Sequence, residues 1–307
     1  MDRLVFILGT ILLFQCSSDY EPVFTGKTIY HDWNSDKLKL NIDGQLKEFN
    51  LPTSETIDYN SPIWLRGQDT ILMTRTEKTD SCISYSVVSF DTNGDLLDTI
   101  FKSGPCTIIE FMPSPNDKLL LLRTYNYADW FSKNKVGRVN YLVYDIFRHS
   151  IQDSISFDNT NLELDKFHES IWSPDSKNVL LFATAGNSEQ IGFIYNLNEG
   201  KKLLDSGTNF IWSPTDNDLV SYLKDNEIVF KNLDSNERTS FYRGQEDKAI
   251  NDFRWNPTGE FLVINFNGQF LNIDSKATWR PTSILVSVHD KRESKVFERH
   301  NVYDSWK

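Results

Sequence analysis

Two segments of the sequence combine aromatic side chains with basic ones, which is the composition of a binding surface. The first spans about 124–139 and the second about 267–283, in a chain whose formal net charge is −11. Exposed aromatic residues beside Arg and Lys typically contact sugars, peptides or protein partners. The candidate contact residues are Tyr125, Tyr127, Trp130, Phe131, Trp279 and Arg280.

The alternative is that each segment folds over its own sheet and buries these aromatic rings. Trp130→Ala and Trp279→Ala distinguish the two cases. If the rings contact a ligand, either substitution leaves the melting temperature nearly unchanged, whereas a large loss of stability would return them to the core.

The sequence lacks the motifs of the common enzyme classes. There is no Gly-x-Ser-x-Gly motif, and Gly26-Lys27-Thr28 lacks the upstream glycine of a phosphate loop. The segment Asp91–Asp95 resembles a calcium loop but has no distal Glu, which favours a simple turn. The histidines are scattered without metal-site spacing; they are His31, His149, His168, His289 and His300. We therefore expect no metal, no cofactor and no catalytic residue.

The elements that must position these residues repeat along the chain. Trp-Ser-Pro-Asp at 172–175 has copies at 212–215 and 255–258, a degenerate copy within 111–121, and a copy without Pro within 63–73. Each copy precedes an apolar strand pattern, and units recurring every roughly 40 to 60 residues indicate a repeat architecture. The repeated Trp and Pro residues are predicted to wedge between units and to shape the first turn; they are Trp172, Trp212, Trp255, Pro174, Pro214 and Pro257.

A second repeated feature sets the number of units. Six segments join an apolar strand end to an Asp-, Asn- or Gly-containing turn, as a tight hairpin requires; they begin near residues 41, 90, 144, 195, 232 and 288. With the strands behind each Trp, the units become four-stranded sheets, and four-stranded sheets repeated around an axis form a β-propeller. The predicted complete blades span about 62–102, 109–158, 169–206, 208–243 and 251–298.

The sequence thus predicts an all-β, six-bladed propeller whose sixth blade is split between the two chain ends. Residues 27–51 supply its later strands, and the segment Val302–Trp306 pairs with them to close the ring. Trp33-Asn-Ser-Asp36 is a further copy of the motif. If it begins a blade of its own, the propeller has seven blades.

The Trp-Ser-Pro-Asp units resemble the propeller repeats of TolB and of the N-terminal domains of prolyl-oligopeptidase-type proteins. This resemblance covers most of the chain after the N-terminal segment. It implies the fold and says little about function, because such propellers serve translocation, gating and binding alike.

The repeat register assigns the two aromatic segments and two cysteines to one face. In a propeller, loops joining second to third strands lie on the same face as the connectors between blades. Cys82 ends such a loop and Cys106 lies in the following connector. A disulfide between them would close a loop of about 24 residues and stabilise the protein by roughly 3 kcal/mol.

The N-terminus carries an export signal. Residues 4–14 form an apolar run after Arg3, too short for the about 20 residues of a spanning helix. The run ends at Gln15-Cys16 and resembles a lipoprotein signal of the Bacteroidetes type, in which Cys16 carries the lipid. We predict a signal peptide over 1–15, a tether over 16–23 and a propeller domain over 24–307. Ordinary secretion, with cleavage just after Cys16–Ser18, is the alternative.

These features predict an exported, lipid-anchored, non-catalytic protein of the bacterial cell envelope, on the periplasmic or surface side of the outer membrane. Its propeller would bind a protein partner or an extracellular glycan or peptide through the aromatic face. Nucleic acid is excluded as a partner, because a net charge of −11 repels phosphate backbones. Two alternatives stay open: a hydrolase or lyase with carboxylates at the central channel, and a structural envelope component.

Overall fold

The computed structural model describes ten stretches of the chain. They are residues 27–32, 37–65, 67–80, 82–126, 139–157, 162–164, 172–185, 190–245, 249–273 and 276–296. These residues form strands and turns without a helix, and none of them belongs to a helix of the length and apolar character needed to cross a bilayer. The chain divides into two compact units, Met1–Asn50 and Leu51–Lys307.

The first unit contains one antiparallel sheet in the order β1-β2-β3. Its strands are β1 (Lys27–Asp32), β2 (Lys37–Ile42) and β3 (Gln45–Phe49). Asp43 and Gly44 form the β2–β3 turn with φ values of 51° and 87°, the left-handed geometry that a two-residue hairpin requires. The Asn41 side chain accepts a hydrogen bond from the Gly44 N–H at 2.9 Å, which fixes this turn.

The second unit begins with two four-stranded antiparallel sheets. The first has the order β4-β5-β6-β7 and the second β8-β9-β10-β11. The first sheet comprises β4 (Ile57–Trp64), β5 (Thr70–Lys78), β6 (Ile83–Asp91) and β7 (Leu96–Lys102). The second comprises β8 (Thr107–Pro113), β9 (Leu119–Asn126), β10 (Val139–Asp145) and β11 (Ser150–Phe157).

The third and fourth sheets share one long strand and so form a continuous seven-stranded sheet. Its strands are β12 (Leu162–Leu164), β13 (Asn178–Ala185), β14 (Gln190–Asn196), β15 (Gly200–Trp212), β16 (Leu219–Lys224), β17 (Glu227–Asn232) and β18 (Arg238–Arg243). The first part of β15 pairs with β14, and its last residues pair with β16. The fifth sheet contains β19 (Ile250–Trp255), β20 (Phe261–Ile273), β21 (Lys276–Ser287) and β22 (Glu293–Val296).

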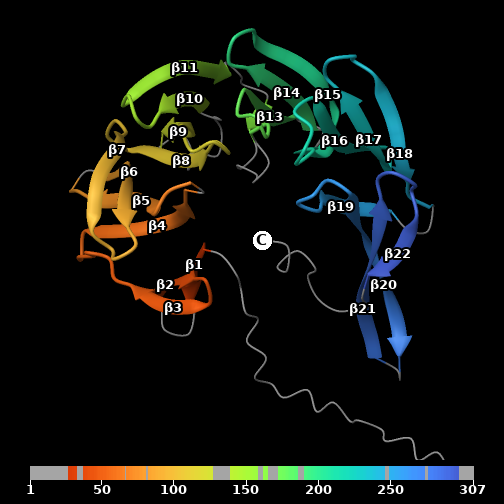
Figure 1. The fold of residues 1–307 in the computed structure, drawn as a ribbon, viewed down its shortest axis with the longest axis horizontal. Coiled ribbons are helices and arrows are strands. Elements are labelled where there is room, and N and C mark those ends of the chain that lie inside the picture. The colour runs from red at the N-terminus through yellow and green to blue at the C-terminus, as the bar shows by residue number, and fades with distance from the viewer. Residues whose placement is uncertain are drawn as a thin grey trace, which may run out of the picture. The chain divides into compact units, whose positions relative to one another are not determined.

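The apolar core of the second unit lies between successive sheets. Leu72 and Val87 of the first sheet pack with Phe111 and Leu122 of the second, and equivalent clusters join each later sheet to the next. In Figure 1 the five sheets follow one another along an arc, with β4, β8 and β19 on its inner side. This is the arrangement of blades in a β-propeller.

The repeated Trp residues join neighbouring blades, as predicted. Trp212 is 4% exposed and packs against the third sheet. The indole N–H of Trp172 donates to the Met112 carbonyl at 3.1 Å, and that of Trp255 donates to the Ser221 hydroxyl at 2.8 Å. Each of these bonds reaches the preceding blade and gives the indole N–H an acceptor.

The predicted hairpins are confirmed in all five blades. Each third-to-fourth strand turn contains a residue with positive φ; these are Gly94, His149, Gly200, Asn236 and Lys291. Asp91 accepts backbone hydrogen bonds from Asn93 and Asp95 at 2.8 and 2.9 Å, so the segment that resembles a calcium loop is a turn. Side-chain acceptors at the strand end therefore fix these turns.

The predicted blade count of six, or seven, is wrong for the arrangement found, in which the described residues form five four-stranded blades. The hairpin near residue 41 formed as predicted, but its sheet has three strands and belongs to the separate first unit. Counting hairpins overestimated complete blades, because a hairpin forms locally whereas a blade also needs an inner strand. The segment Val302–Trp306, predicted to close the ring, and Trp33–Asp36 lie outside the described residues.

Candidate functional site

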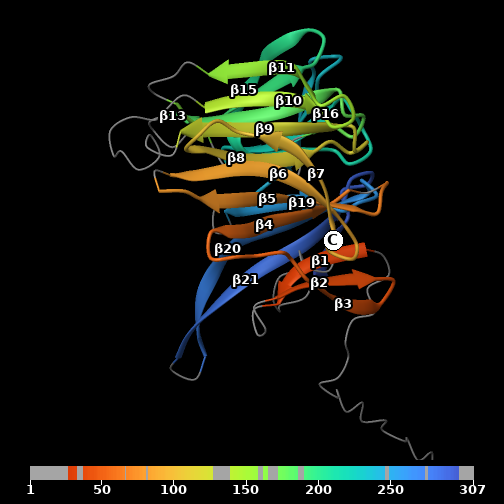
Figure 2. The ribbon, with the colours of Figure 1, turned by 90° about the vertical axis from the view of Figure 1, so that its left-hand side faces the viewer.

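A cavity of about 410 Å³ lies between the first and second blades. Its volume falls within the range of about 300–1,000 Å³ that is typical of ligand pockets. Its walls come from the inner strands β4 and β8 and from β5 and β6, and β6 lies alongside β8 (Figure 2). The lining residues are Asn60, Ser61, Thr74, Tyr85, Ile108, Ile109, Glu110 and Phe111.

The wall from the first blade is polar. A β-bulge interrupts the pairing of β4 with β5 between Asn60 and Ile63, and Ser61 adopts a left-handed φ of 52°. Bulges re-aim side chains at sheet edges, and here the Ser61 hydroxyl donates to the Asn60 side chain at 3.3 Å. Thr74 on β5 adds a hydroxyl and is 3% exposed. This wall therefore offers hydrogen-bonding groups.

The wall from the second blade is a run of four consecutive residues on β8. Ile109 and Phe111 pack toward the first blade, whereas Ile108 packs toward the third. Successive side chains of a strand point to opposite faces, so a cavity that touches all four residues must meet the backbone edge of β8. Because β8 is the last strand in the order of its sheet, no other described strand of the sheet pairs with this edge.

Glu110, which lines the cavity, accepts hydrogen bonds from two donors on β9. The Arg123 guanidinium donates to one carboxylate oxygen at 3.0 Å, and the Tyr125 hydroxyl donates to the other at 3.2 Å. Arg123 is 2% exposed, so the ion pair compensates a buried charge. Burial, together with the negative charge of Glu110, raises the pKa of Tyr125 to about 12. These two hydrogen bonds fix the orientation of the Glu110 carboxylate.

The predicted contact residues of the first aromatic segment fall in two places. Tyr125 lies on β9, is 9% exposed and packs in the core cluster between the second and third blades. Its ring is thus part of the protein interior. Tyr127, Trp130 and Phe131 lie outside the described residues.

The second aromatic segment is a β-hairpin where the sequence predicts a loop. Trp279 and Arg280 lie on β21, paired with Phe270 and Gln269 of β20. The two strands continue to the pair Ile273 and Lys276. The sequence does not distinguish a loop from a long hairpin here, because alternating polar and apolar residues are also typical of strands.

Cys82 and Cys106 form the predicted disulfide, with a Cα–Cα distance of 5.4 Å. The bond joins the loop between β5 and β6 to the connector that leads into β8. Cys106 stands one residue before the first residue of β8 and has a φ of 55°. The disulfide therefore anchors the strand that forms one wall of the cavity.

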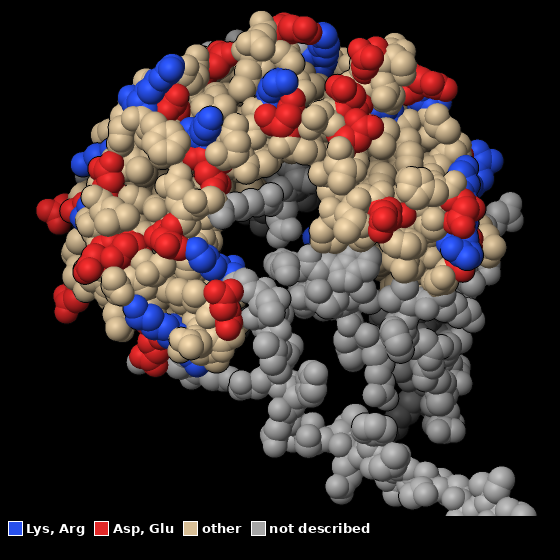
Figure 3. Space-filling model, in the orientation of Figure 1, with Lys and Arg blue, Asp and Glu red and all other residues tan. Residues whose placement is uncertain are grey.

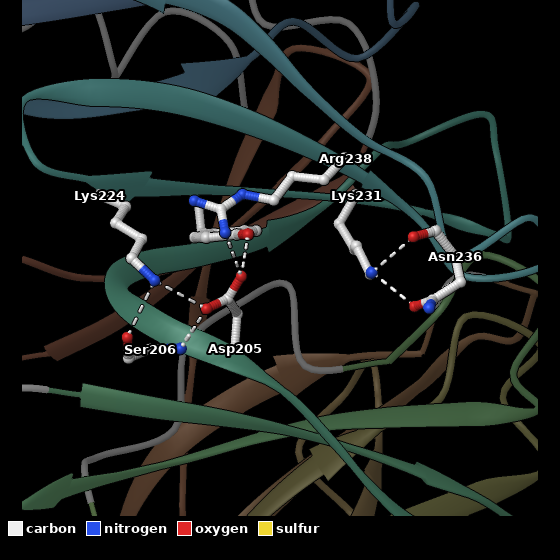
Figure 4. Close-up of polar contacts among 7 residues, drawn as sticks. Asp205, Ser206, Lys224, Lys231, Asn236 and Arg238 are labelled. Atoms are coloured by element: carbon white, nitrogen blue, oxygen red, sulfur yellow. Dashed lines mark hydrogen bonds and ion pairs between the residues drawn. The ribbon is translucent and has the colours of Figure 1, made fainter.

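Sequence reasoning missed a polar cluster around Asp205, shown in Figure 4. The Asp205 carboxylate accepts hydrogen bonds from the Tyr222 hydroxyl at 2.5 Å and the Lys224 ammonium at 2.9 Å. Arg238 forms an ion pair with it at 3.2 Å. Close by, Lys231 donates to the Asn236 carbonyl at 2.8 Å.

Asp205 links the third blade to the fourth. It lies on the part of β15 that pairs with β14, whereas Tyr222, Lys224 and Arg238 belong to β16 and β18. Burial raises the pKa of the Asp205 carboxyl, but hydrogen bonds from Tyr222 and Lys224 outweigh burial and hold the pKa below its usual value. In sequence, Asp205 looks like any turn or surface aspartate.

The described residues also show how charged side chains are distributed and whether potential metal ligands are grouped. Figure 3 shows Lys and Arg interspersed with Asp and Glu, without a broad basic area on the face in view. Among the described residues, no three His, Cys, Asp or Glu side chains are grouped as metal ligands would be.

Comparison with known proteins identifies the fold. No model of a protein family matches the chain, and no curated protein matches it. Among solved structures, the chain is similar to a protein assigned as a dipeptidyl aminopeptidase IV from Bacteroides ovatus, with 10% identity and a TM-score of 0.58. That match covers 89% of this chain and 44% of the other.

Two further solved structures are similar. An oligogalacturonate lyase in complex with manganese has 12% identity and a TM-score of 0.56, over 90% of this chain and 73% of the other. TolB from Acinetobacter baumannii has 14% identity and a TM-score of 0.47, over 84% of this chain and 58% of the other. This chain thus spans less than two thirds of the TolB chain. At these identities the comparisons show a β-propeller fold alone.

Proposed function

We propose that this protein is an exported, lipid-anchored β-propeller that binds a ligand without catalysing a reaction. The ligand is a protein partner or an extracellular glycan or peptide, and the cavity between the first two blades is its binding site. The observation that carries this proposal is that cavity, about 410 Å³ in volume, with hydroxyl, amide and apolar walls. A purely structural envelope component would have no need of such a cavity.

The Cys82–Cys106 disulfide supports export, because disulfides persist in oxidising compartments outside the cytoplasm. With Cys16 as the lipid-bearing residue, the remaining two cysteines form this pair. The anchor would hold the protein on the periplasmic or surface side of a bacterial outer membrane.

The aromatic segment after β9 supports a ligand site at the same end of the second blade. Asn126, the last residue of β9, pairs with Thr107, the first residue of β8. Strand β9 therefore ends close to Ile108 of the cavity wall, and Tyr127 and Trp130 follow it in the sequence. We propose that these aromatic residues extend the binding surface beyond the cavity.

A hydrolase or lyase mechanism is less well supported. Of the inner-strand carboxylates, Glu110 accepts from Arg123 and Tyr125, and Asp252 accepts from the Asn265 amide at 2.7 Å. Glycoside hydrolysis typically uses a pair of carboxylates. Among the residues that line the cavity, Glu110 is the one carboxylate.

Ligand binding is tested with arrays of glycans and of peptides probed with the purified chain. Asn60 lines the cavity and is exposed, so Asn60→Trp adds an indole at its mouth. Asn251 is an exposed residue of β19 and stands four positions before Trp255 in the sequence, as Asn60 stands four positions before Trp64. Asn251→Trp is therefore the matched control. We expect binding that Asn60→Trp weakens and Asn251→Trp retains. Arrays without any such ligand would refute a glycan or peptide ligand, the two classes that they contain.

Lipid anchoring is tested by growing the source cells, or a bacterial host, with labelled palmitate. The wild-type chain and Cys82→Ser are expected to incorporate the label, and Cys16→Ser to lose it. Label retained by Cys16→Ser would contradict the anchor.

A further inference from the structure

The inner strands of the blades differ in the regularity of their free edges. The pairing register is broken by bulges between Asn60 and Ile63 in β4, between Thr208 and Ile211 in β15, and between Ile250 and Asp252 in β19. The pairing of β8 with β9 runs from Thr107 to Pro113 without a shift.

This difference matters for pairing with another chain. Bulges twist an edge and discourage the addition of a strand, whereas a regular edge keeps its unpaired N–H and C=O groups in the order that a new strand needs. Of these four inner strands, β8 has the regular edge. The Met112 carbonyl of β8 accepts from the Trp172 indole, and the segment that lines the cavity, Ile108–Phe111, ends before that contact.

The cavity lies against this same edge. Ile108–Phe111 line it, and four residues of a strand span roughly 13 Å at about 3.3 Å each. The opposite wall is the bulged segment Asn60–Ser61. The space therefore accommodates a short extended segment running along β8.

We propose that the cavity binds an extended peptide segment, which adds to β8 as a further strand. This inference rests on the proposed function, a ligand site in the cavity, and names the class of ligand. In strand addition, main-chain hydrogen bonds supply affinity and the pockets beside alternate residues supply specificity.

The walls also select the peptide's side chains. Glu110 is the one charged residue among those lining the cavity, and its charge is balanced by Arg123. The remaining lining residues supply hydroxyls, an amide and the apolar residues Ile108, Ile109 and Phe111. We expect bound peptides to place small polar or apolar, uncharged residues here.

The first experiment selects binders to the full chain from a displayed library of random eight-residue peptides. Synthetic hits are titrated against wild type, Asn60→Trp and Asn251→Trp. We expect Asn60→Trp to weaken binding about tenfold or more and Asn251→Trp less than about twofold. Circular dichroism verifies that both variants fold. Hits that both variants bind equally well would place the peptide elsewhere and overturn the inference.

The second experiment tests the strand geometry on the wild-type chain and needs no variant. Each hit is resynthesised with a single N-methyl group at successive residues. Strand addition predicts an alternating pattern, with about tenfold weaker binding wherever the methylated N–H faces β8 and little change between. Hydrogen exchange within Ile108–Phe111 should slow when the peptide binds.

The outcomes separate the inference from the proposed function. Cavity-dependent peptides that tolerate N-methylation at every residue would overturn strand addition and leave the ligand site standing. A glycan whose binding Asn60→Trp abolishes, with no cavity-dependent peptide, would do the same. If no glycan or peptide is found whose binding Asn60→Trp weakens, both strand addition and the ligand site in the cavity would be refuted.

Discussion

At the residue scale, the polar groups with most consequence are two half-buried carboxylates, Asp205 and Glu110. Asp205 gathers a tyrosine, a lysine and an arginine from the neighbouring blade, and Glu110 is held by a buried arginine and a tyrosine. Such clusters stabilise the fold when every member is bonded and destabilise it when one member is removed. Substitution of a single carboxylate should therefore be costly.

Asp205→Asn is predicted to lower the free energy of unfolding by about 1–3 kcal/mol at pH 7, the value of hydrogen bonds to a charged group. Because the pKa of Asp205 is lowered in the folded state, the unfolded chain binds more protons in acid. The carboxylate's contribution is present above the unfolded pKa of about 3.9 and is lost as pH falls through the folded pKa.

Urea unfolding of wild type and Asp205→Asn from pH 7 to pH 2 measures this effect. The difference between them should shrink below about pH 4. Glu199→Gln is the control, because Glu199 pairs with Lys202 on an exposed turn. A difference independent of pH would show that the charge of Asp205 contributes nothing.

Residue positions were the least predictable level. For Tyr125 the sequence left two cases open, a ligand contact or a ring buried against its own sheet; β9 continues to Asn126 and the ring lies in the core. The stretch Arg123-Thr124-Tyr125 reads as surface because a charged residue is seldom buried. Glu110, on the neighbouring strand, pairs with the buried Arg123, and a single sequence does not show that pairing.

At the scale of elements, the repeated Trp strands connect each blade to the one before it. Trp212→Ala is predicted to cost roughly 3–5 kcal/mol, because the indole is 4% exposed in the core between two blades. Leu203→Ala on the same strand, where Leu203 is 69% exposed, should change stability by less than about 0.5 kcal/mol. Chemical denaturation of both variants compares them, and similar losses would contradict the assigned role of the Trp.

The disulfide is the second testable element. Replacing Cys82 and Cys106 by Ser should lower stability by roughly 3 kcal/mol, because the unfolded chain loses a closed loop. Thiol labelling under denaturing, non-reducing conditions should find neither cysteine in the wild-type chain. Labelling of both would show that the bond does not form in the cell.

Elements were largely predictable, because hairpins and the Trp turns depend on local sequence. Asp, Asn and Gly mark the turns, and the inner strands carry the repeated motif. The inner strands begin earlier than predicted: β4 starts at Ile57, where the sequence suggests 62. Bulges such as the one at Asn60 were not predicted, because they depend on the register with a partner strand.

At the scale of the whole molecule, the fold class followed from the repeats, but the number of blades did not. Sequence similarity among repeats predicts that sheets pack side by side. How many complete the arrangement depends on contacts between residues far apart in sequence, which repeats do not encode. The pairing of Val302–Trp306 with residues 27–51 accordingly stays a prediction.

Removal of residues 302–307 tests that pairing. If the segment supplies an inner strand, its deletion should lower the melting temperature by several degrees, because a 1 kcal/mol loss shifts the midpoint by about 2–4 °C in large domains. Trp306→Phe, which keeps an aromatic ring, should cost less. A deletion that leaves the melting temperature unchanged would rule out ring closure by this segment.

The sharing of β15 between two sheets has a consequence for where the chain can be opened. A break or insertion between Asp205 and Thr208 would sever hydrogen-bond ladders on both sides at once. New termini placed instead in the turn at Ser235–Asn236, whose residues are exposed, would leave every ladder intact. Circular permutants should therefore tolerate the second site and fail at the first, and the two blades should exchange their amide protons as a single cooperative block.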